Sequence, residues 1–356
     1  MNNVNPAVLP ASNLYQTWQN LRIEQPRLRA RDAAAELGVS EVELTASRLG
    51  VDAVRLRTDW AQLLPGLGDL GYIMALTRNE HCVHERKGLY REVSVSANGA
   101  MGLVVSADID LRLFLSQWAS AFAIAENRER GVQRSIQIFD RQGVAVHKVY
   151  LTERSEEAAW APLVERFRDE AQSAELDLQP LAERQAPRAD SQVDAAALRT
   201  DWAQLKDTHH FFAMLKRHEV ARTQALRLAG HEWAEPLATA ELPRLMEAAA
   251  QREVPIMVFV GNRHCIQIHT GPVSNLRWMD TWFNVLDAEF NLHLRTTGVV
   301  ELWRVRKPSV DGVITSLEAF DADGELVVQL FGARKPGMAE RDDWRELVES
   351  IAVLEA

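Results

Sequence analysis

The chain has 356 residues, with 50 acidic against 40 basic side chains and a formal net charge of −10 at pH 7. This balance argues against a broad nucleic-acid-binding surface, although it is compatible with a local basic patch. Two cysteines are too few for a disulfide framework, and no apolar run has the form of a signal peptide or a membrane span. We therefore expect a cytoplasmic protein with two domains.

The first predicted helices lie within residues 14–50, after an Asn- and Pro-rich start. Residues 31–44 contain small side chains, a glycine turn and a serine cap, in the order of a helix-turn-helix. DNA contact through residues 31–48 is one interpretation, with phosphate contacts from Arg27, Arg29, Arg31 and Arg48. The alternative is an ordinary helical hairpin, and Glu41 and Glu43 favour it because carboxylates do not suit a DNA groove.

An internal repeat is the main organisational feature. The octapeptide Leu-Arg-Thr-Asp-Trp-Ala-Gln-Leu occurs at 56–63 and again at 198–205. Shorter echoes pair Asn79–Cys82 with Asn262–Cys265, and Phe139–Gly143 with Phe320–Gly324. We interpret the chain as a duplicated domain, with one repeat at 1–175 and the other at 197–356. Residues 176–196 lack an apolar period and are predicted to form a linker.

Each repeat is predicted to have an α+β fold, a large mainly antiparallel sheet with flanking helices. In the first repeat, the sequence predicts short strands with polar turns between them at 72–76, 81–85, 92–96, 102–106, 135–139 and 145–151, and helices at 111–125 and 156–170. In the second, it predicts strands at 256–260, 265–270, 298–306, 313–320 and 326–333, and helices at 205–217 and 240–252.

The segment 206–215 contains the histidines of greatest chemical interest. Asp207 or Thr208 can cap a helix, which places His209 and His210 in the first turn, followed by an apolar face with two phenylalanines. The helix dipole favours neutral imidazole there, and neutral imidazole binds metals. One interpretation is an axial ligand to the iron of a flat ring, and the other is a capped helix with ordinary histidines. The first repeat has residues 64–68 at the matching place, without histidine.

Other residues have weaker signals. His81-Cys82-Val83-His84 has metal-like spacing, but the two histidines face opposite ways on a strand, which favours a structural role. Arg112 opens an apolar helical pattern, and cations follow strands of the second repeat at Arg306, Lys307, Arg334 and Lys335. Basic groups near an apolar floor suit a ligand with an apolar body and acidic edges. Each could equally be a solvated surface charge.

Longer stretches within residues 14–354 carry a resemblance to a known family. They are 74–80, 146–152, 207–209 with 211–212, 224–226 with 229–230, 256–262, 265–273, 290–295 and 306–308. In these stretches the chain resembles the bacterial cytoplasmic haem-trafficking and haemin-degrading proteins encoded with haem-uptake systems. It departs from the family at Val328, where an aromatic or polar residue is common.

The resemblance implies two similar repeats whose sheets stack in a saddle, and a cleft that holds haem b. It places the axial ligand at His209, with His210 as the less favoured alternative, and the distal arginine at Arg112. Further haem or propionate contacts fall on Phe114, Arg222, Lys307, Gln329, Phe331 and Arg334.

Three functions follow from the resemblance and the residues. The favoured one is a carrier that receives imported haem and delivers it to a haem-degrading oxygenase. The second is a haem-degrading enzyme, which would need electrons from a partner because the sequence has no flavin or nicotinamide motif. The third is a haem-responsive DNA-binding regulator. The sequence leaves the oligomeric state open.

Overall fold

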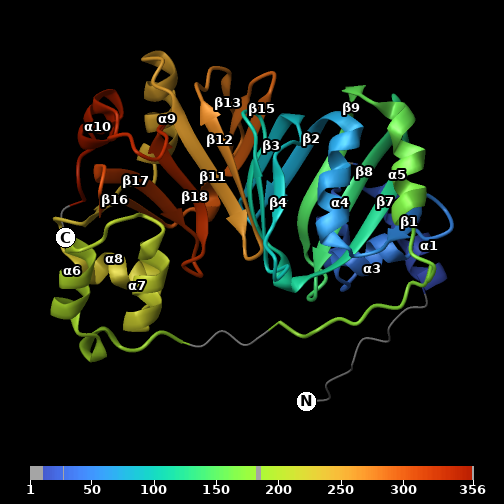
Figure 1. Ribbon diagram of the computed structural model, residues 1–356, viewed down its shortest axis with the longest axis horizontal. Coiled ribbons are helices and arrows are strands. Elements are labelled where there is room, and N and C mark those ends of the chain that lie inside the picture. Colours follow the sequence, from blue (N-terminus) through green and yellow to red (C-terminus); the bar gives the residue numbers. More distant parts are fainter. Residues whose placement is uncertain (1–10, 27, 182–185, 355–356) are drawn as a thin grey trace. The chain divides into compact units, whose positions relative to one another are not determined.

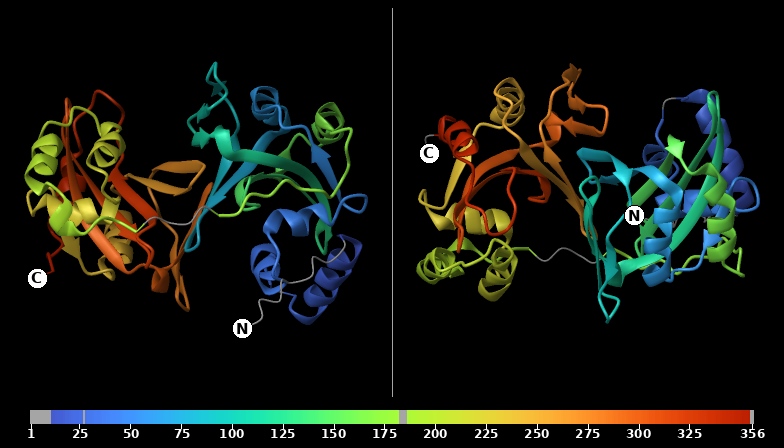
Figure 2. Two further views of the ribbon diagram at one scale, coloured as in Figure 1. Left: turned by 90° about the horizontal axis from the view of Figure 1, so that it is seen from below. Right: turned by 45° about the horizontal axis from the view of Figure 1, so that its top comes forward.

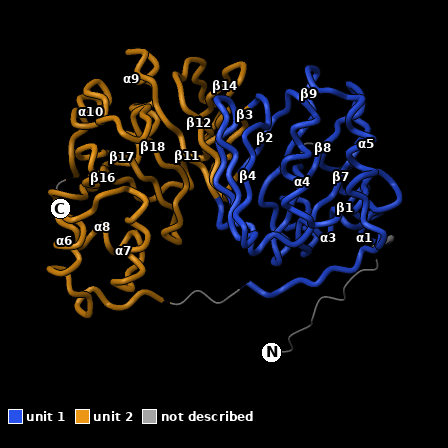
Figure 3. Tube along the Cα trace, viewed as in Figure 1, with its two compact units in different colours: residues 1–77, 87–182, 262–265 blue, residues 78–86, 183–261, 266–356 orange. Residues whose placement is uncertain are grey.

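The computed structural model describes residues 11–26, 28–181 and 186–354. The chain divides into two compact units (Figure 3). The first unit comprises residues 1–77, 87–182 and 262–265, and the second comprises residues 78–86, 183–261 and 266–356. Each unit thus includes a short segment from the other half of the sequence, which the predicted repeats at 1–175 and 197–356 do not include.

The elements of the first half of the chain are shown in Figure 1. They are α1 (Ala11–Glu24), α2 (Ala30–Glu36), α3 (Glu41–Ala46), β1 (Ala53–Leu56), α4 (Trp60–Gly66), β2 (Gly71–Arg78), β3 (Cys82–Leu89), β4 (Val93–Val95), β5 (Met101–Val105), β6 (Asp110–Phe114), β7 (Trp118–Arg128), β8 (Gly131–Asp140), β9 (Ala145–Ser155) and α5 (Trp160–Phe167).

The second half repeats this order with differences in length. Its elements are α6 (Ala195–Ala203), α7 (His210–His218), α8 (Arg222–Ala229), β10 (Ala234–Leu237), α9 (Glu241–Gln251), β11 (Ile256–Asn262), β12 (Cys265–Gly271), β13 (Leu276–Met279), β14 (Trp282–Leu286), β15 (Phe290–Arg295), β16 (Glu301–Ser309), β17 (Gly312–Phe320), β18 (Leu326–Gly332) and α10 (Asp342–Glu349).

Antiparallel strands form the core of each unit. The strand order is β1-β7-β8-β9-β2 in the first unit and β10-β16-β17-β18-β11 in the second. The first two strands of each run pair in the same register. The first residue of β1, Ala53, lies opposite Ile124 of β7, and the first residue of β10, Ala234, lies opposite Val305 of β16. The predicted α+β class with large antiparallel sheets is therefore confirmed.

Helices cover both faces of the sheet in the second unit. On one face, side chains of α9 and α10 such as Met246 and Trp344 pack with Leu317 and Leu330 in an apolar core. On the other face, α6, α7 and α8 form a separate group, which Figures 1 and 2 show apart from α9 and α10. This second face carries polar residues among its apolar ones, and α7, which the predicted histidine ligand precedes, packs on this side.

The repeated octapeptide does not mark structurally equivalent positions. Leu56 ends β1, whereas Leu198 lies inside α6, and the structural counterpart of Leu56 is Leu237 at the end of β10. The helices α1–α3 before β1 therefore correspond to α6–α8 before β10. The counterpart of the His209 segment is the connection before α2, and not residues 64–68 as the octapeptide suggested. That connection also lacks histidine, so the histidine at this place is specific to the second half.

Two predicted helices are wrong in whole or in part. Residues 111–125 form β6 and β7 with the turn between them, because Leu111 and Leu113 alternate with half-buried polar neighbours and fill one face of the sheet. The helix predicted at 205–217 begins only at His210, since the carboxylate of Asp207 bonds the backbone amide of His209 in a turn before it (2.8 Å).

The predicted helix-turn-helix is a helical hairpin packed on its own unit. Ser40 caps α3 in a capping box with Glu43, as the sequence indicated. Five of the six residues of α3 are buried, namely Glu41, Val42, Leu44, Thr45 and Ala46. Glu41 pairs with Lys148 of β9 at 2.8 Å. The helix that would have supplied base contacts thus has no free face for a DNA groove. Arg27, one of the predicted phosphate contacts, lies outside the described residues.

The predicted linker packs partly on the first unit. Ala174, Leu176 and Leu178 lie against a small apolar core that includes Phe122 and Phe139. The guanidinium of Arg55 also donates to the backbone carbonyls of Ser173 and Glu175, just before this stretch. Within the described ranges of the chain, no helix is long and apolar enough to span a membrane.

Candidate functional site

His209 lies in an exposed turn immediately before α7 and forms its N-cap. Its side chain is 81% exposed, and its Nδ1 lies 2.6 Å from Oδ1 of Asp207. A carboxylate accepts hydrogen bonds, so this contact places the proton on Nδ1 and leaves the lone pair of Nε2 directed outward. The backbone amide of His209 lowers the pKa of Asp207, which keeps this carboxylate ionised. The arrangement is typical of a histidine that binds a metal through Nε2.

The aromatic residues beside His209 divide between core and surface. Phe211 is buried and packs edge-on against Trp202 at 4.7 Å between ring centroids. Phe212 is 75% exposed, contrary to the expectation that both phenylalanines form one apolar face. Positions 209 and 212 are three residues apart at the start of a helix, so an exposed imidazole and an exposed phenyl ring lie on the same side. His210 is also exposed, and it remains the alternative ligand.

Three of the predicted contact residues converge on a residue that the sequence did not suggest. Glu318 of β17 is fully buried, and it accepts hydrogen bonds from Arg222 Nε and Gln329 Nε2, each at 2.7 Å. Lys307 Nζ also donates to this carboxylate. We call Arg222, Lys307, Glu318 and Gln329 the Glu318 cluster. Its members come from α8 and from the three adjacent strands β16, β17 and β18.

The electrostatics of the Glu318 cluster keep it charged. Burial acts to raise the pKa of Glu318, but the charges of Arg222 and Lys307 outweigh it and hold that pKa well below its ordinary value. Burial lowers the pKa of Lys307 to about 8, against the attraction of Glu318. The Lys307 ammonium also lies 4.5 Å from the centroid of the Phe211 ring. At neutral pH the cluster therefore carries two cations and one anion.

Phe331 contributes an aromatic surface beside the Glu318 cluster. Phe331 and Gln329 are two residues apart in β18, so their side chains lie on the same face of the strand. Neither is part of the apolar core that α9 and α10 cover. The Phe331 ring contacts Phe259 of β11 at 5.1 Å between centroids, and both rings are half-buried. Val328 points the other way into that apolar core, so the residue that departs from the family pattern does not face this surface.

Arg334 is tied to the His209 segment through the hairpin between β16 and β17. Its Nη2 donates to Asp311 Oδ2 of this hairpin at 2.6 Å. The neighbouring Val310 amide donates to the carbonyl of Lys206, three residues before His209 (3.0 Å). Within the second unit, Arg222, Lys307 and Gln329 thus meet at Glu318, whereas Arg334 and the segment before His209 both contact the hairpin between β16 and β17.

Arg112 and Phe114 belong to the first unit, where they lie on the same face of β6. Arg112 is half-buried and pairs with Asp110. In the register of the sheet, Leu103 of β5 lies opposite Arg112, and Met101 lies opposite Phe114. Both of these β5 side chains are exposed, at 36% and 39%. Arg112 therefore lies on an accessible, largely apolar sheet face.

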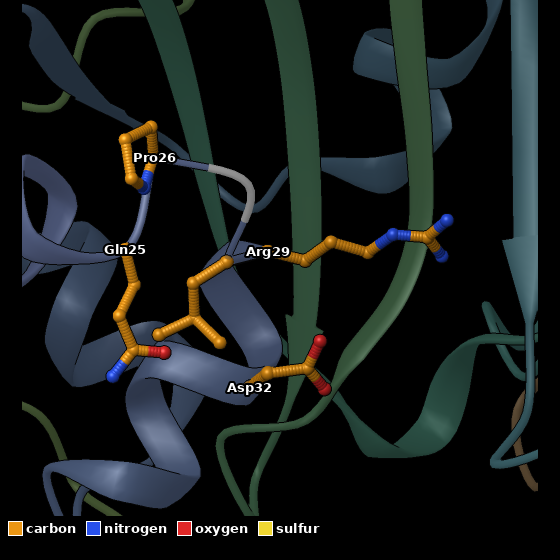
Figure 4. Close-up of a pocket in the computed structure, with 5 residues that line it drawn as sticks. Gln25, Pro26, Arg29 and Asp32 are labelled. Carbon is orange, nitrogen blue, oxygen red and sulfur yellow. The ribbon is translucent and has the colours of Figure 1, made fainter.

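A separate surface hollow in the first unit does not coincide with these residues. It is lined by Gln25, Pro26, Leu28, Arg29 and Asp32, around the connection between α1 and α2 (Figure 4). This connection is the counterpart of the His209 segment, but Leu28 and Arg29 offer no neutral nitrogen ligand. Within the described parts of the chain, no group of three or more His, Cys, Asp or Glu residues could hold a bare metal ion.

Comparison with known proteins identifies the family. The model of the family described as "Haemin-degrading HemS.ChuX domain" matches residues 38–167 and again residues 219–351. The chain belongs to this family. The two matches begin at equivalent points of the two halves, in agreement with the shared strand register of the two units.

Several relatives cover almost the whole chain. The hemin transport protein HmuS of Yersinia pestis is 42% identical over 96% of this chain and 97% of its own length. The crystal structure of holo-PhuS, a heme-binding protein from Pseudomonas aeruginosa, is 69% identical with a TM-score of 0.96, covering 97% of this chain and all of that one. The heme degrading enzyme ChuS of Escherichia coli O157:H7 is 38% identical with a TM-score of 0.89, covering 96% and 99%.

Sequence reasoning missed Glu318, and it missed Asp207 as the partner of the histidine ring. A signal for Glu318 was present, because a single carboxylate interrupts the otherwise apolar second half of strand Gly312–Phe320. An uncompensated charge inside a buried strand is costly and indicates a buried cationic partner. The sequence did not reveal that the partners would be the predicted ligand-binding cations themselves.

Proposed function

We propose that this chain is a cytoplasmic haem carrier, which binds imported haem through His209 and delivers it to a haem-degrading oxygenase. The observation that carries the proposal is the exposed imidazole of His209, whose Nδ1 is bonded to Asp207 and whose Nε2 is free to bind iron. Membership of a haem-utilisation family supports it, as does the description of HmuS as a hemin transport protein.

The remaining residues have roles consistent with haem b as the cargo. Phe212 and Phe331 would contact the apolar macrocycle, and the Glu318 cluster and Arg334 would balance the propionates. Arg112 and Phe114 of the first unit are proposed as further haem contacts, and the Arg112 guanidinium can donate hydrogen bonds. The iron of the bound haem supplies any redox chemistry, and the chain supplies one imidazole, apolar contact and positive charge.

A second function, degradation of haem by this chain, is kept because ChuS is described as a heme degrading enzyme. The test is to incubate the haem complex with ascorbate in air, with and without catalase. Catalase removes the peroxide that free reductant makes from oxygen. The carrier proposal expects catalase to preserve the Soret band, and tetrapyrrole cleavage that persists with catalase would contradict it. Delivery itself is tested by loss of haem to an added haem oxygenase.

Replacing Asp207 by alanine is expected to weaken haem binding by about 10-fold, because partners that orient a metal-bound histidine contribute roughly 10- to 100-fold to metal affinity. The Soret band should stay near its native position, since His209 still binds iron. Haem titration followed by absorbance measures this, and replacing Asp201, which pairs with His218 on the same group of helices, is the control. Equal affinities of the Asp207 variant and the native chain would exclude this orienting role.

A further inference from the structure

The centre of the Glu318 cluster is a carboxylate that has no contact with solvent. Besides Arg222, Gln329 and Lys307, it accepts a hydrogen bond from Ser316 Oγ at 3.1 Å. Glu318 thus fixes donors from α8, β16 and β18, and one from its own strand. Removing such a carboxylate would leave a buried ammonium without its anion, which is a large electrostatic cost.

The same positions in the first unit have the opposite charge. Glu41 is the first residue of α3, as Arg222 is of α8. Glu126 lies two residues beyond the Ala53–Ile124 pair, just as Lys307 lies two residues beyond Ala234–Val305. Carboxylates in the first unit therefore occupy the places of the two cations in the second. The duplicated scaffold does not require cations at these places, which points to a ligand requirement specific to the second unit.

We infer that Glu318 is a positioning residue of the haem site, because it holds Arg222 in place and keeps Lys307 charged. Two cations and one carboxylate leave a net charge of +1, so the Glu318 cluster is the counter-ion for one carboxylate of a porphyrin. This inference rests on the proposed haem-binding function. It also changes the role of Lys307, which is 3% exposed and acts through the charge of the cluster and not by touching the ligand.

The charge of the cluster depends on Lys307. The charged groups among the described residues that act on this ammonium are Glu318 and Arg222, and the Phe211 ring packs against it. Since the pKa of Lys307 lies at about 8, the net charge of the cluster falls from +1 to 0 as the pH rises through that value. In the Glu318→Gln variant the attraction of the carboxylate is lost, so Lys307 loses its proton at a lower pH.

The experiment titrates the full chain with zinc protoporphyrin IX between pH 6.5 and 9.5 and follows porphyrin fluorescence. This probe has both carboxylates of haem, and its zinc avoids the ionisation of water on ferric iron. The dimethyl ester of the same porphyrin has no carboxylate charge and is titrated in parallel. The variants are Glu318→Gln, Lys307→Met and the control Glu235→Gln, which removes a carboxylate that pairs with Arg304 and Arg306 on the same sheet.

For the native chain and Glu235→Gln, we expect affinity for the diacid to fall about 10-fold above a midpoint near pH 8, and affinity for the ester to stay constant. Glu318→Gln should lower the midpoint by about one pH unit or more. Lys307→Met should bind the diacid weakly at every pH. A midpoint in Glu318→Gln equal to that of the native chain would overturn the inference.

The remaining outcomes are equally decisive. If Glu318→Gln does not fold, Lys307→Met alone decides, and a pH midpoint near 8 that persists without this amine overturns the inference. A pH dependence shared by the dimethyl ester also overturns it, because the ester has no carboxylate for the cluster to balance. If the native chain binds neither porphyrin, the proposed haem-binding function fails as well, whereas tight binding with the wrong pH profile removes only the role of Glu318.

Discussion

The His209→Ala variant is expected to bind haem about 100-fold more weakly than the native chain and to show a shifted Soret band. We propose this imidazole as the axial ligand, and the neighbouring His210 at the start of α7 is the alternative. Its Nδ1 contact with Asp207 orients the ring, and its exposure leaves Nε2 open to iron. Loss of this nitrogen removes a covalent contact that the apolar surfaces cannot replace.

The matched control is His210→Ala, which removes another exposed imidazole one residue later. Successive side chains on a helix point about 100° apart, so the two rings cannot bind one iron from the same direction. We expect this variant to keep the native spectrum. If His210→Ala loses the Soret shift and His209→Ala retains it, the ligand is His210 and the assignment is wrong.

Acidification from pH 7 to pH 5 is expected to destabilise the folded chain by several kcal/mol. His84, His147 and His269 are buried, and burial is the largest cause that lowers the pKa of each. For His147 and His269 the pKa falls to about 4. In the unfolded chain each would titrate near 6.5, so between about pH 6.5 and 4 the unfolded state binds more protons. Stability then falls by about 1.4 kcal/mol per pH unit for each histidine as the pH decreases.

Urea unfolding at pH 7.5, 6, 5 and 4.5 measures this slope. His84 provides the matched variant, because neither of its ring nitrogens has a hydrogen-bond partner among the described residues and its ring packs against Phe290. His84→Leu removes the titrating group without breaking a hydrogen bond. The change in unfolding free energy per pH unit should therefore be smaller in the variant by the contribution of one histidine. A slope that is the same in the native chain and the variant would show that His84 titrates normally.

Strands of both units could be predicted where short runs lie between polar turns. The runs at 72–76 and 313–320 are examples, and they fall within β2 and β17. β7 was missed because its sequence, Trp-Ala-Ser-Ala-Phe-Ala-Ile-Ala, is rich in alanine, which favours helices locally. Packing on β1 and β8 overrides this preference in the folded unit.

Features that depend on tertiary structure could not be predicted from the sequence. The octapeptide at 56–63 and 198–205 suggested a repeat register that the strands contradict, because identical short sequences can form different elements in different surroundings. The local sequence also does not show that residues 78–86 belong to the second unit and residues 262–265 to the first. Asn79, for example, donates to the carbonyl of Val327 at 2.8 Å, and Asn262 makes the same bond to Val146.

The candidate site was predicted from the resemblance more than from the local pattern. His209 was predicted as the axial ligand and stays a prediction, and Arg222 and Lys307 were expected to pair with the propionates. In the structure both are bound to Glu318. A buried carboxylate that neutralises one of two cations changes the charge offered to a ligand, and only the packed side chains reveal it.

The most direct test of haem binding through one histidine is the absorption spectrum of the purified chain during titration with haemin. We predict a saturable Soret shift with an end point at one haem per chain, and a resonance Raman band for an iron–imidazole bond in the ferrous form. A spectrum that stays that of free haemin, or one that never saturates, would contradict the account.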